Sequence, residues 1–267
     1  MNSAAEAQQI AQLLAKEWGL TLETPFPLST CSFVVACEGD LVLKVPYEES
    51  EERQSAWVLL AYADLGGVEV LRFDESTGAI LMPRLGIALS DSVLLEEERV
   101  SVCAGLIKRL HEAPLDDRGI ALEKWFSEPP ADAPELMHAA WSVAKTLIET
   151  TSHRVILHGD LHHFNILQAA DGWRAIDPKG LVGDPAYEPC SYLRNPVGGL
   201  PPDDELAGFM ARRLELFASF LPYPAERMWG WAFAQTVWCG QDCSWSAGAD
   251  WQRAGEALWE IKRSFWP

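Results

Sequence analysis

LHGDLHHFNIL (Leu157–Leu167) places three histidines, one aspartate and one asparagine in an otherwise apolar run. The β-rich runs FNILQ and WRAID, which overlap and follow it, flank an Asp171-Gly172 turn, a pattern that predicts a β-hairpin. Such a hairpin brings Asn165 beside Asp177, with Asp160 close to both. Three converging oxygen-bearing side chains suit Mg²⁺, which prefers oxygen ligands and shares its shell with water and substrate phosphates.

A lysine in the first part of the chain completes the set of groups that phosphoryl transfer needs, namely a carboxylate base, an amide and a carboxylate on metal, and a lysine on the phosphates. Lys44 lies in LVLKVP, an apolar run that predicts a strand, where an unpaired charge is costly. Glu51 or Glu52, at the start of the next predicted helix, can pair with it. The preceding PLSTC segment, which contains Ser29 and Thr30, can cover phosphates through backbone N–H groups and hydroxyls.

The pattern along the chain changes once, near residues 86–88. Before this break we expect a helix over residues 3–18, a hairpin in CSFVVACEGDLVLKV, a helix over 48–65, and strands in VEVLRFD and AILMPRL. After it, helices are expected over 89–111, 133–151, 203–220, 224–243 and 249–264. The sequence therefore predicts an α+β protein of two parts, residues 1–86 and 87–267.

Composition narrows the class of protein. A formal net charge of −18 argues against a nucleic-acid partner, which would require lysines and arginines on phosphates, and is compatible with a cationic small-molecule ligand. No run is long and apolar enough to span a bilayer, and the N-terminal stretch lacks a signal-peptide pattern. We therefore expect no membrane partner. The six cysteines form no tight CxxC pair, which is compatible with a reducing compartment, so we expect a cytoplasmic protein.

LHGDLHHFNIL followed by AIDPKGLVGDPAYE resembles the aminoglycoside phosphotransferase family, and most closely its branch of streptomycin 6-kinases and hydroxyurea-resistance kinases. The resemblance is specific from Leu157 to about Pro196. Over the first part of the chain it consists of the order of features only: a loop, Lys44, an acidic helix, and ILMPRL as the hinge strand. It implies a protein-kinase-like two-lobed fold, in which residues 1–86 are the nucleotide-binding N-lobe and residues 87–267 the catalytic, acceptor-binding C-lobe.

The resemblance also implies a role for each matching residue. Asp160 corresponds to the catalytic base, Asn165 and Asp177 to the magnesium ligands, and Lys44 to the lysine on the ATP phosphates, with Glu52 as its acidic partner. His158 is expected to brace the loop. The adenine is expected to hydrogen-bond to the backbone of the hinge, near Met82, Arg84 and Leu85.

Two departures distinguish the chain from protein kinases. Asp177 lies in Ile-Asp-Pro and not in Asp-Phe-Gly, and the phosphate-covering loop lacks G-x-G-x-x-G. Both fit a small-molecule kinase, and both leave the phosphate contacts undefined.

Several other residues have competing interpretations. His162 and His163 suggest a transition-metal site, but no accompanying cysteines or acids have zinc spacing, so packing in the loop is favoured. Asp184 fits an N-cap. Glu188 is interpreted either as a contact to a cationic substrate or as an exposed helical glutamate. At helical spacing lie Trp238, Asp242 and Trp245. They are interpreted either as a wall that contacts a cationic substrate or as part of the core.

These observations predict an ATP- and Mg²⁺-dependent O-phosphotransferase that acts on a hydroxyl of a small molecule, such as a streptomycin-like aminoglycoside or hydroxyurea. Two alternatives remain open. One is a metabolic kinase with a choline-like or amino-sugar acceptor, and the other is a non-catalytic nucleotide-binding pseudokinase.

Overall fold

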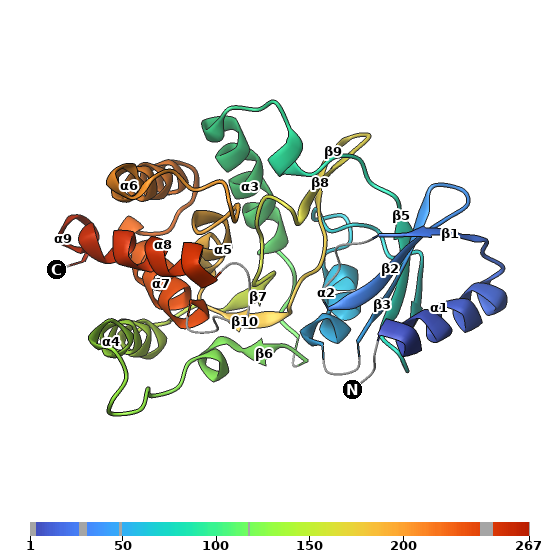
Figure 1. Cartoon of the computed structure of the whole chain (residues 1–267), viewed down its shortest axis with the longest axis horizontal. Coiled ribbons are helices and arrows are strands. Elements are labelled where there is room, and N and C mark those ends of the chain that lie inside the picture. Colours follow the sequence, from blue (N-terminus) through green and yellow to red (C-terminus); the bar gives the residue numbers. More distant parts are fainter. Residues whose placement is uncertain (1–3, 27–30, 48–49, 117, 241–247, 267) are drawn as a thin grey trace.

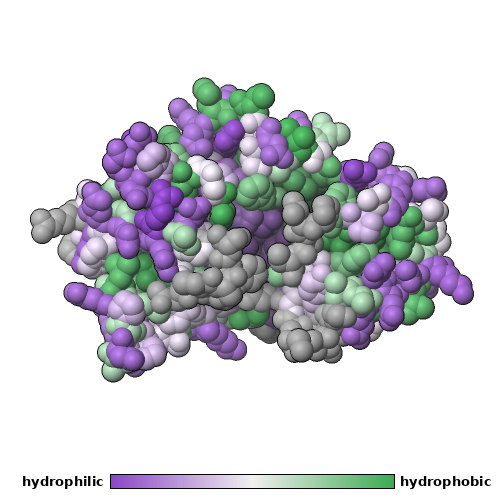
Figure 2. Space-filling view, viewed as in Figure 1, coloured by the Kyte–Doolittle hydropathy of each residue, from purple (hydrophilic) through white to green (hydrophobic). Residues whose placement is uncertain are grey.

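The computed structural model describes residues 4–26, 31–47, 50–116, 118–240 and 248–266. A five-stranded sheet with helix α1 (Ala4–Trp18) on one face forms the N-terminal lobe at one end of the molecule, and a mainly helical lobe forms the other end (Figure 1). Hydrophilic and hydrophobic residues are interspersed over the face in Figure 2, and hydrophilic residues line the recess between the lobes. This is the two-lobed α+β architecture that the sequence predicts.

The sheet of the N-terminal lobe is antiparallel throughout, and its strand order is β1-β2-β3-β5-β4. The strands are β1 (Leu22–Pro25), β2 (Ser32–Cys37), β3 (Leu41–Pro46), β4 (Arg72–Asp74) and β5 (Ala79–Pro83). Because side chains alternate along a strand, Leu43 and Val45 of β3 pack in the cluster that includes α1, whereas Val42 packs in the cluster beneath α2 (Ser55–Ala61). Lys44 therefore shares a face with Val42 and points toward the second lobe.

Two small sheets lie in the C-terminal lobe. The predicted hairpin is present as β8 (Ile166–Ala169) and β9 (Gly172–Ala175), with Ile166 opposite Ala175. The other sheet has the order β6-β10-β7, formed by β6 (Ile120–Ala121), β10 (Leu181–Gly183) and β7 (Val155–Leu157). These strands of two or three residues are too short to produce a period-two pattern, which is why the sequence does not predict them.

Helices form the remainder of the C-terminal lobe: α3 (Glu96–Leu110), α4 (Glu135–Glu149), α5 (Cys190–Leu193), α6 (Asp203–Phe220), α7 (Ala225–Cys239), α8 (Gly248–Glu260) and α9 (Lys262–Phe265). Single 3₁₀ turns occur at η1 (Glu51–Gln54), η2 (Leu89–Asp91), η3 (Leu122–Trp125) and η4 (Pro185–Tyr187). Helix α7 is buried continuously from Met228 to Val237, and it contacts α4, α5, α6 and α8. A helix that is apolar on all sides belongs at the centre of a lobe.

Three expected elements differ from those observed. The helix expected from residue 89 begins at Glu96, where three consecutive acids favour a helix N-terminus. The helix expected over 48–65 is a 3₁₀ turn followed by the short helix α2. In VEVLRFD only residues 72–74 form a strand, because the N–H of Val68 bonds instead to the carbonyl of Ala175 at 2.9 Å, which ties this segment to the other lobe.

No helix within the described ranges is both long and apolar enough to cross a membrane.

Candidate active site

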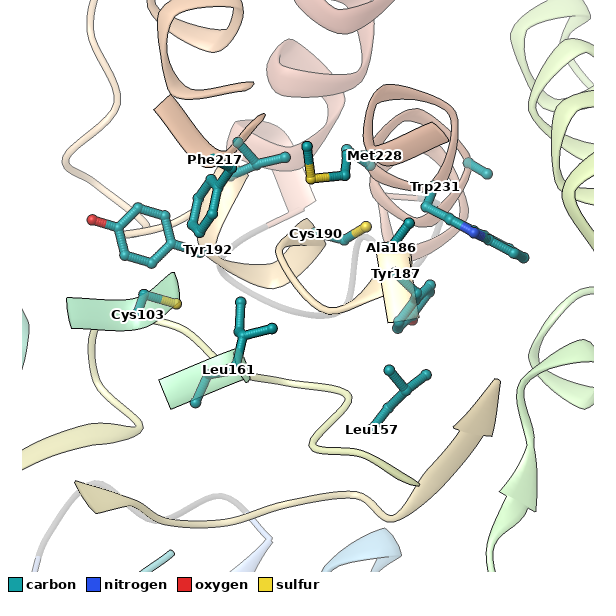
Figure 3. Close-up of a cluster of buried hydrophobic side chains, with 14 of the residues drawn as sticks. Cys103, Leu157, Leu161, Ala186, Tyr187, Cys190, Tyr192, Phe217, Met228 and Trp231 are labelled. Carbon is teal, nitrogen blue, oxygen red and sulfur yellow. The ribbon is translucent and has the colours of Figure 1, made fainter. Parts of the chain in front are cut away.

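The loop between β7 and β8 is held from below by apolar anchors. Leu157 and Leu161 are fully buried, and their side chains point into the cluster drawn in Figure 3 with Tyr187, Cys190 and Trp231. Of the residues between the two leucines, His158 is buried and Asp160 is 23% exposed, so the aspartate is the polar group of this stretch that solvent reaches.

Glu188 supports the same loop from behind. Its Oε2 accepts a hydrogen bond from the backbone N–H of His158 at 2.8 Å, and its Oε1 accepts one from Gly159 at 2.9 Å. Gly159 has φ +80°, and an added Cβ would lie 3.0 Å from the Leu181 side chain, so the position requires glycine. Glu188 is buried, and although burial opposes its charged form, hydrogen bonding to His111 and these amides keeps its pKa lowered.

Glu188 is 1% exposed, so the interpretation of it as an exposed helical glutamate was wrong, and its contacts in this structure are to the loop and not to the cleft. A buried carboxylate is held by the several donors that satisfy it, and both oxygens of Glu188 are engaged by the loop amides and His111.

The hairpin brings Asp160, Asn165 and Asp177 together as expected. The Asn165 side-chain Nδ2 donates to the Asp160 carbonyl at 2.9 Å, which leaves Asn165 Oδ1 available for a cation. The backbone N–H of Ile176 donates to the Asn165 carbonyl at 3.0 Å, so Asp177 follows directly beside Asn165. Asp177 has φ +61°, a strained conformation for an aspartate that is found preferentially at functional sites.

Lys44 joins the two lobes through its side chain. Its Nζ lies 2.5 Å from Asp177 Oδ1 and 2.9 Å from Glu52 Oε2, and the lysine is only 2% exposed. Burial opposes the charged form, but the neighbouring carboxylates of Asp177 and Glu52 outweigh it and raise the pKa of Lys44. Glu52 is thus a carboxylate placed on Lys44.

These donors fit Mg²⁺. Asp177 and Asn165 offer one carboxylate and one amide oxygen, a small protein contribution of the kind that Mg²⁺ accepts when water and substrate phosphates complete its shell. The described residues contain no cluster of three or more His, Cys, Asp or Glu side chains that could hold an ion by themselves. His163 instead stacks on Tyr192 with ring centroids 3.8 Å apart, and burial lowers its pKa to about 2.

Asp160 has a different environment at each of its oxygens. Oδ1 accepts a hydrogen bond from Ser191 Oγ at 2.9 Å and lies 3.6 Å from Arg194 Nη2. Oδ2 lies 3.8 Å from His162 Nε2 and 3.9 Å from Lys179 Nζ. Burial opposes the charged form, but the charge of Lys179, followed by His162 and Arg194, keeps the pKa of Asp160 lowered. Asp160 is therefore a carboxylate at neutral pH.

The expected hinge residues lie at the apolar side of this site. Met82 and Leu85 pack in one cluster with Val42 and Ile176, the residue before Asp177. The backbone N–H of Arg84 is already bonded to the Asp40 carbonyl at 2.7 Å, and the guanidinium of Arg84 lies over the Phe26 ring. Arg84 thus offers neither its N–H nor its side chain to an adenine.

The remaining predicted residues are only partly described. Trp238 is partly buried and packs against Phe126, with ring centroids 5.8 Å apart, so it belongs to the edge of the core. Four others lie outside the described residues: Ser29, Thr30, Asp242 and Trp245. Asp184 caps η4 as expected, by accepting from the Ala186 N–H at 3.0 Å.

Sequence reasoning missed three residues that surround Asp160. Lys179 was visible as a charge two positions after Asp177. Ser191 and Arg194 gave no signal, because α5 has only four residues and its contact with Asp160 depends on how it packs on α7.

The fold has two lobes, and Lys44 of the first pairs with Glu52 and with Asp177 of the second. Asn165 and Asp160 lie beside Asp177. This arrangement defines a kinase-like phosphotransferase. The family model described as aminoglycoside/hydroxyurea antibiotic resistance kinase matches residues 29–247, and the chain belongs to this family. It is thus a phosphotransferase that acts on small molecules.

Individual relatives agree with this assignment. The streptomycin 3''-kinase of Klebsiella pneumoniae is 31% identical over 223 residues, which cover 78% of this chain and 79% of that protein. The hydroxyurea phosphotransferase of Kitasatospora aureofaciens is 32% identical over 260 residues, which cover 89% and 72%.

Solved structures share the fold at lower sequence identity. The choline kinase LicA from Streptococcus pneumoniae superposes with a TM-score of 0.67 at 16% identity, covering 94% of this chain and 99% of that one. An aminoglycoside phosphotransferase crystallised with ADP and hygromycin B superposes with a TM-score of 0.61, also at 16% identity, covering 94% and 98%.

Proposed function

We propose that this chain transfers the γ-phosphoryl group of ATP, with Mg²⁺, to a hydroxyl of streptomycin or of hydroxyurea. The observation that carries the proposal is the contact between Lys44 and Asp177 across the two lobes, 2.5 Å long, on a segment that also touches the Asp160 loop through Asn165. A lysine, a metal-binding pair and an ionised carboxylate close together are the parts that phosphoryl transfer requires.

The nucleotide half of the reaction uses groups from both lobes. Lys44 holds the ATP phosphates, and Glu52 keeps its ammonium in place at 2.9 Å. The apolar cluster containing Met82, Leu85 and Ile176 accommodates the base. Asn165 Oδ1 and the Asp177 carboxylate hold Mg²⁺, which neutralises charge on the phosphates when it is bound.

The acceptor half depends on Asp160. This carboxylate orients the acceptor hydroxyl and takes its proton as the bond to phosphorus forms. Because neighbouring cations lower its pKa, Asp160 is ionised at neutral pH and acts mainly by aligning the hydroxyl. Positioning and charge neutralisation are expected to supply most of the rate enhancement.

The choice of acceptor follows the relatives, which are named as streptomycin kinases and a hydroxyurea phosphotransferase. A net charge of −18 supports a cationic acceptor such as streptomycin over neutral hydroxyurea. Use of ATP fits a cytoplasmic location. Likeness to choline kinases is a likeness of fold, and therefore choline serves as the comparison compound.

A transfer assay tests the proposal. The purified chain is incubated with ATP and Mg²⁺ and with streptomycin, hydroxyurea or choline, and products are identified by mass spectrometry. We expect a phosphate adduct of streptomycin or hydroxyurea. A phosphate adduct of choline alone would show that the acceptor is choline-like and not streptomycin or hydroxyurea. Nucleotide binding without any transfer would identify a pseudokinase.

A further inference from the structure

Arg194 is a buried cation that the groups assigned above do not include. It follows α5 directly, is 4% exposed and lies 3.6 Å from Asp160 Oδ1. A buried arginine is costly unless its charge is compensated. The single salt bridge of Arg194 within the described part of the chain is the one to Asp160. The carboxylate that faces the acceptor is therefore also the counter-ion of a buried guanidinium.

The guanidinium is fixed from three directions. Its Nη1 donates to Ser191 Oγ at 3.0 Å and also to Gln235 Oε1 of α7. Its Cζ lies 4.7 Å from the ring centroid of Trp251 in α8, a cation–π arrangement. Gln235 is held in turn, because its Nε2 donates to Tyr187 Oη at 2.6 Å.

Arg194 and Ser191 act on one oxygen of Asp160 only. The Ser191 hydroxyl accepts from Arg194 and donates to Asp160 Oδ1 at 2.9 Å, so the three residues form a continuous hydrogen-bond chain. Such chains polarise one another and hold a definite orientation. Among the residues that the structure describes, the charged neighbours of Oδ2 are His162 at 3.8 Å and Lys179 at 3.9 Å, which is too far for a hydrogen bond. Asp160 is 23% exposed, and within the described ranges its hydrogen bond goes to Oδ1 and none goes to Oδ2.

We propose that Arg194 is a positioning residue which, through Ser191, fixes Asp160 by Oδ1 and so presents Oδ2 to the acceptor hydroxyl. The proposal rests on the proposed function, since it assigns the orientation of the carboxylate in that reaction. Arginine suits the position because Nη1 donates to Ser191 and Gln235 while Nη2 lies 3.6 Å from Asp160 and the planar group stacks on Trp251, whereas lysine offers a single point charge.

Steady-state kinetics of the full chain test this role. ADP release is measured with ATP and Mg²⁺, with streptomycin, hydroxyurea or water as acceptor, for the wild type and for Arg194→Ala, Arg194→Lys and Ser191→Ala. For Arg194→Ala we expect kcat to fall by about 10²-fold, the effect of a misplacement of roughly 1 Å, with KM for ATP unchanged. In Ser191→Ala we expect kcat to fall by about 10-fold. The kcat of Arg194→Lys should lie between those of the wild type and Arg194→Ala.

Chemical rescue separates positioning from folding. Removing the guanidinium leaves a space between Trp251 and Asp160, so millimolar guanidinium chloride should restore part of kcat in Arg194→Ala, and methylammonium chloride should not. Arg227→Gln is the control: Arg227 of α7 forms a partly buried ion pair with Asp184, and no contact with Asp160 is seen among the described residues. It should lower the melting temperature and keep kcat, with no response to guanidinium.

Wild-type kcat in Arg194→Ala, or a loss of kcat that matches a loss of folded protein and is not rescued, would overturn the role of Arg194. Asp160→Asn distinguishes this from failure of the proposed function. If Asp160→Asn is inactive while Arg194→Ala is fully active, only the inference about Arg194 is wrong. If the wild type releases no ADP with any acceptor or with water, the proposed function and this role fail together.

Discussion

The two charged clusters of the site differ in how they are assembled. The Lys44 cluster draws on β3, on η1 and on the segment after β9, and therefore spans both lobes. The Asp160 cluster, with Ser191 and Arg194, belongs entirely to the C-terminal lobe. Buried apolar residues form the cores of both lobes. One cluster of these residues includes Leu157 and Leu161 of the Asp160 loop together with residues of α5 and α7.

This difference has a physical consequence. The distance from Lys44 to Asp177 depends on how the lobes sit relative to one another, so nucleotide binding can change it. The distance from Asp160 to Ser191 depends on close packing within one lobe, which resists small displacements. The proposed nucleotide side is thus set by contacts between the lobes, whereas the proposed acceptor side is set within one lobe, and four substitutions probe this contrast.

The largest effect is expected at the preorganised carboxylate. Asp160→Asn keeps the shape of the side chain but removes the base, so kcat should fall by at least about 10²-fold. ADP release measured with streptomycin checks this. Asp171→Asn, an exposed carboxylate at the hairpin turn, is the control and should leave kcat unchanged. Comparable turnover in the two variants would remove Asp160 from the reaction.

A smaller effect is expected where the lobes meet. Lys44→Met removes the only ammonium that Glu52 and Asp177 are seen to share within the described residues, and charge-assisted hydrogen bonds to phosphate are lost with it. We expect ATP to bind about 10-fold more weakly or worse, measured by calorimetry. Lys108→Met, an exposed lysine on α3, should bind ATP normally. Unchanged affinity in Lys44→Met would place the phosphates elsewhere.

The brace behind the loop should affect stability more than nucleotide binding. Glu188→Gln keeps one acceptor oxygen and loses the charge, which should lower the free energy of unfolding by about 1.5–3 kcal/mol at pH 7.

The pH dependence of that loss has a definite sign. Because the pKa of Glu188 is lowered in the folded state, its contribution is complete above its unfolded value of about 4.3 and is lost as pH falls below it. The difference between wild type and Glu188→Gln in urea unfolding should therefore shrink from pH 7 toward pH 3. A constant difference would mean that Glu188 is not ionised in the folded protein.

The smallest effect is expected at the exposed end of the hairpin that carries both metal-binding candidates. Asp171 pairs with Arg174 at 2.7 Å, but the aspartate side chain is 73% exposed. Exposed pairs contribute little because water and salt screen them. Asp171→Asn should leave the melting temperature almost unchanged. A larger loss in thermal unfolding would show that the turn helps to hold Asn165 and Asp177 together.

Local patterns predicted part of this structure well. The β8–β9 hairpin has a turn signal between two β-rich runs, and so the meeting of Asn165 with Asp177 could be inferred before any coordinates. Lys44 could be inferred because an isolated charge in an apolar strand needs a partner. Helices α1 and α6 agree with their patterns to within a residue or two.

Other features carried no local signal. Strands β6, β7 and β10 are too short for a periodic pattern. The segment from Val68 lost its predicted strand because it pairs with Ala175 in the other lobe. Glu188 looks like any acid in a helical run, and only its burial against the amides of His158 and Gly159 shows its role.

The sequence by itself determined the kind of chemistry, because the required side chains lie close together along the chain, or stand out as charges among apolar neighbours. Tertiary structure decided the orientation of those groups. Which glutamate meets Lys44, which oxygen of Asp160 is held, and which residues hold it depend on contacts between segments distant in sequence. Such contacts form through packing of whole elements, and no local pattern of residues encodes them.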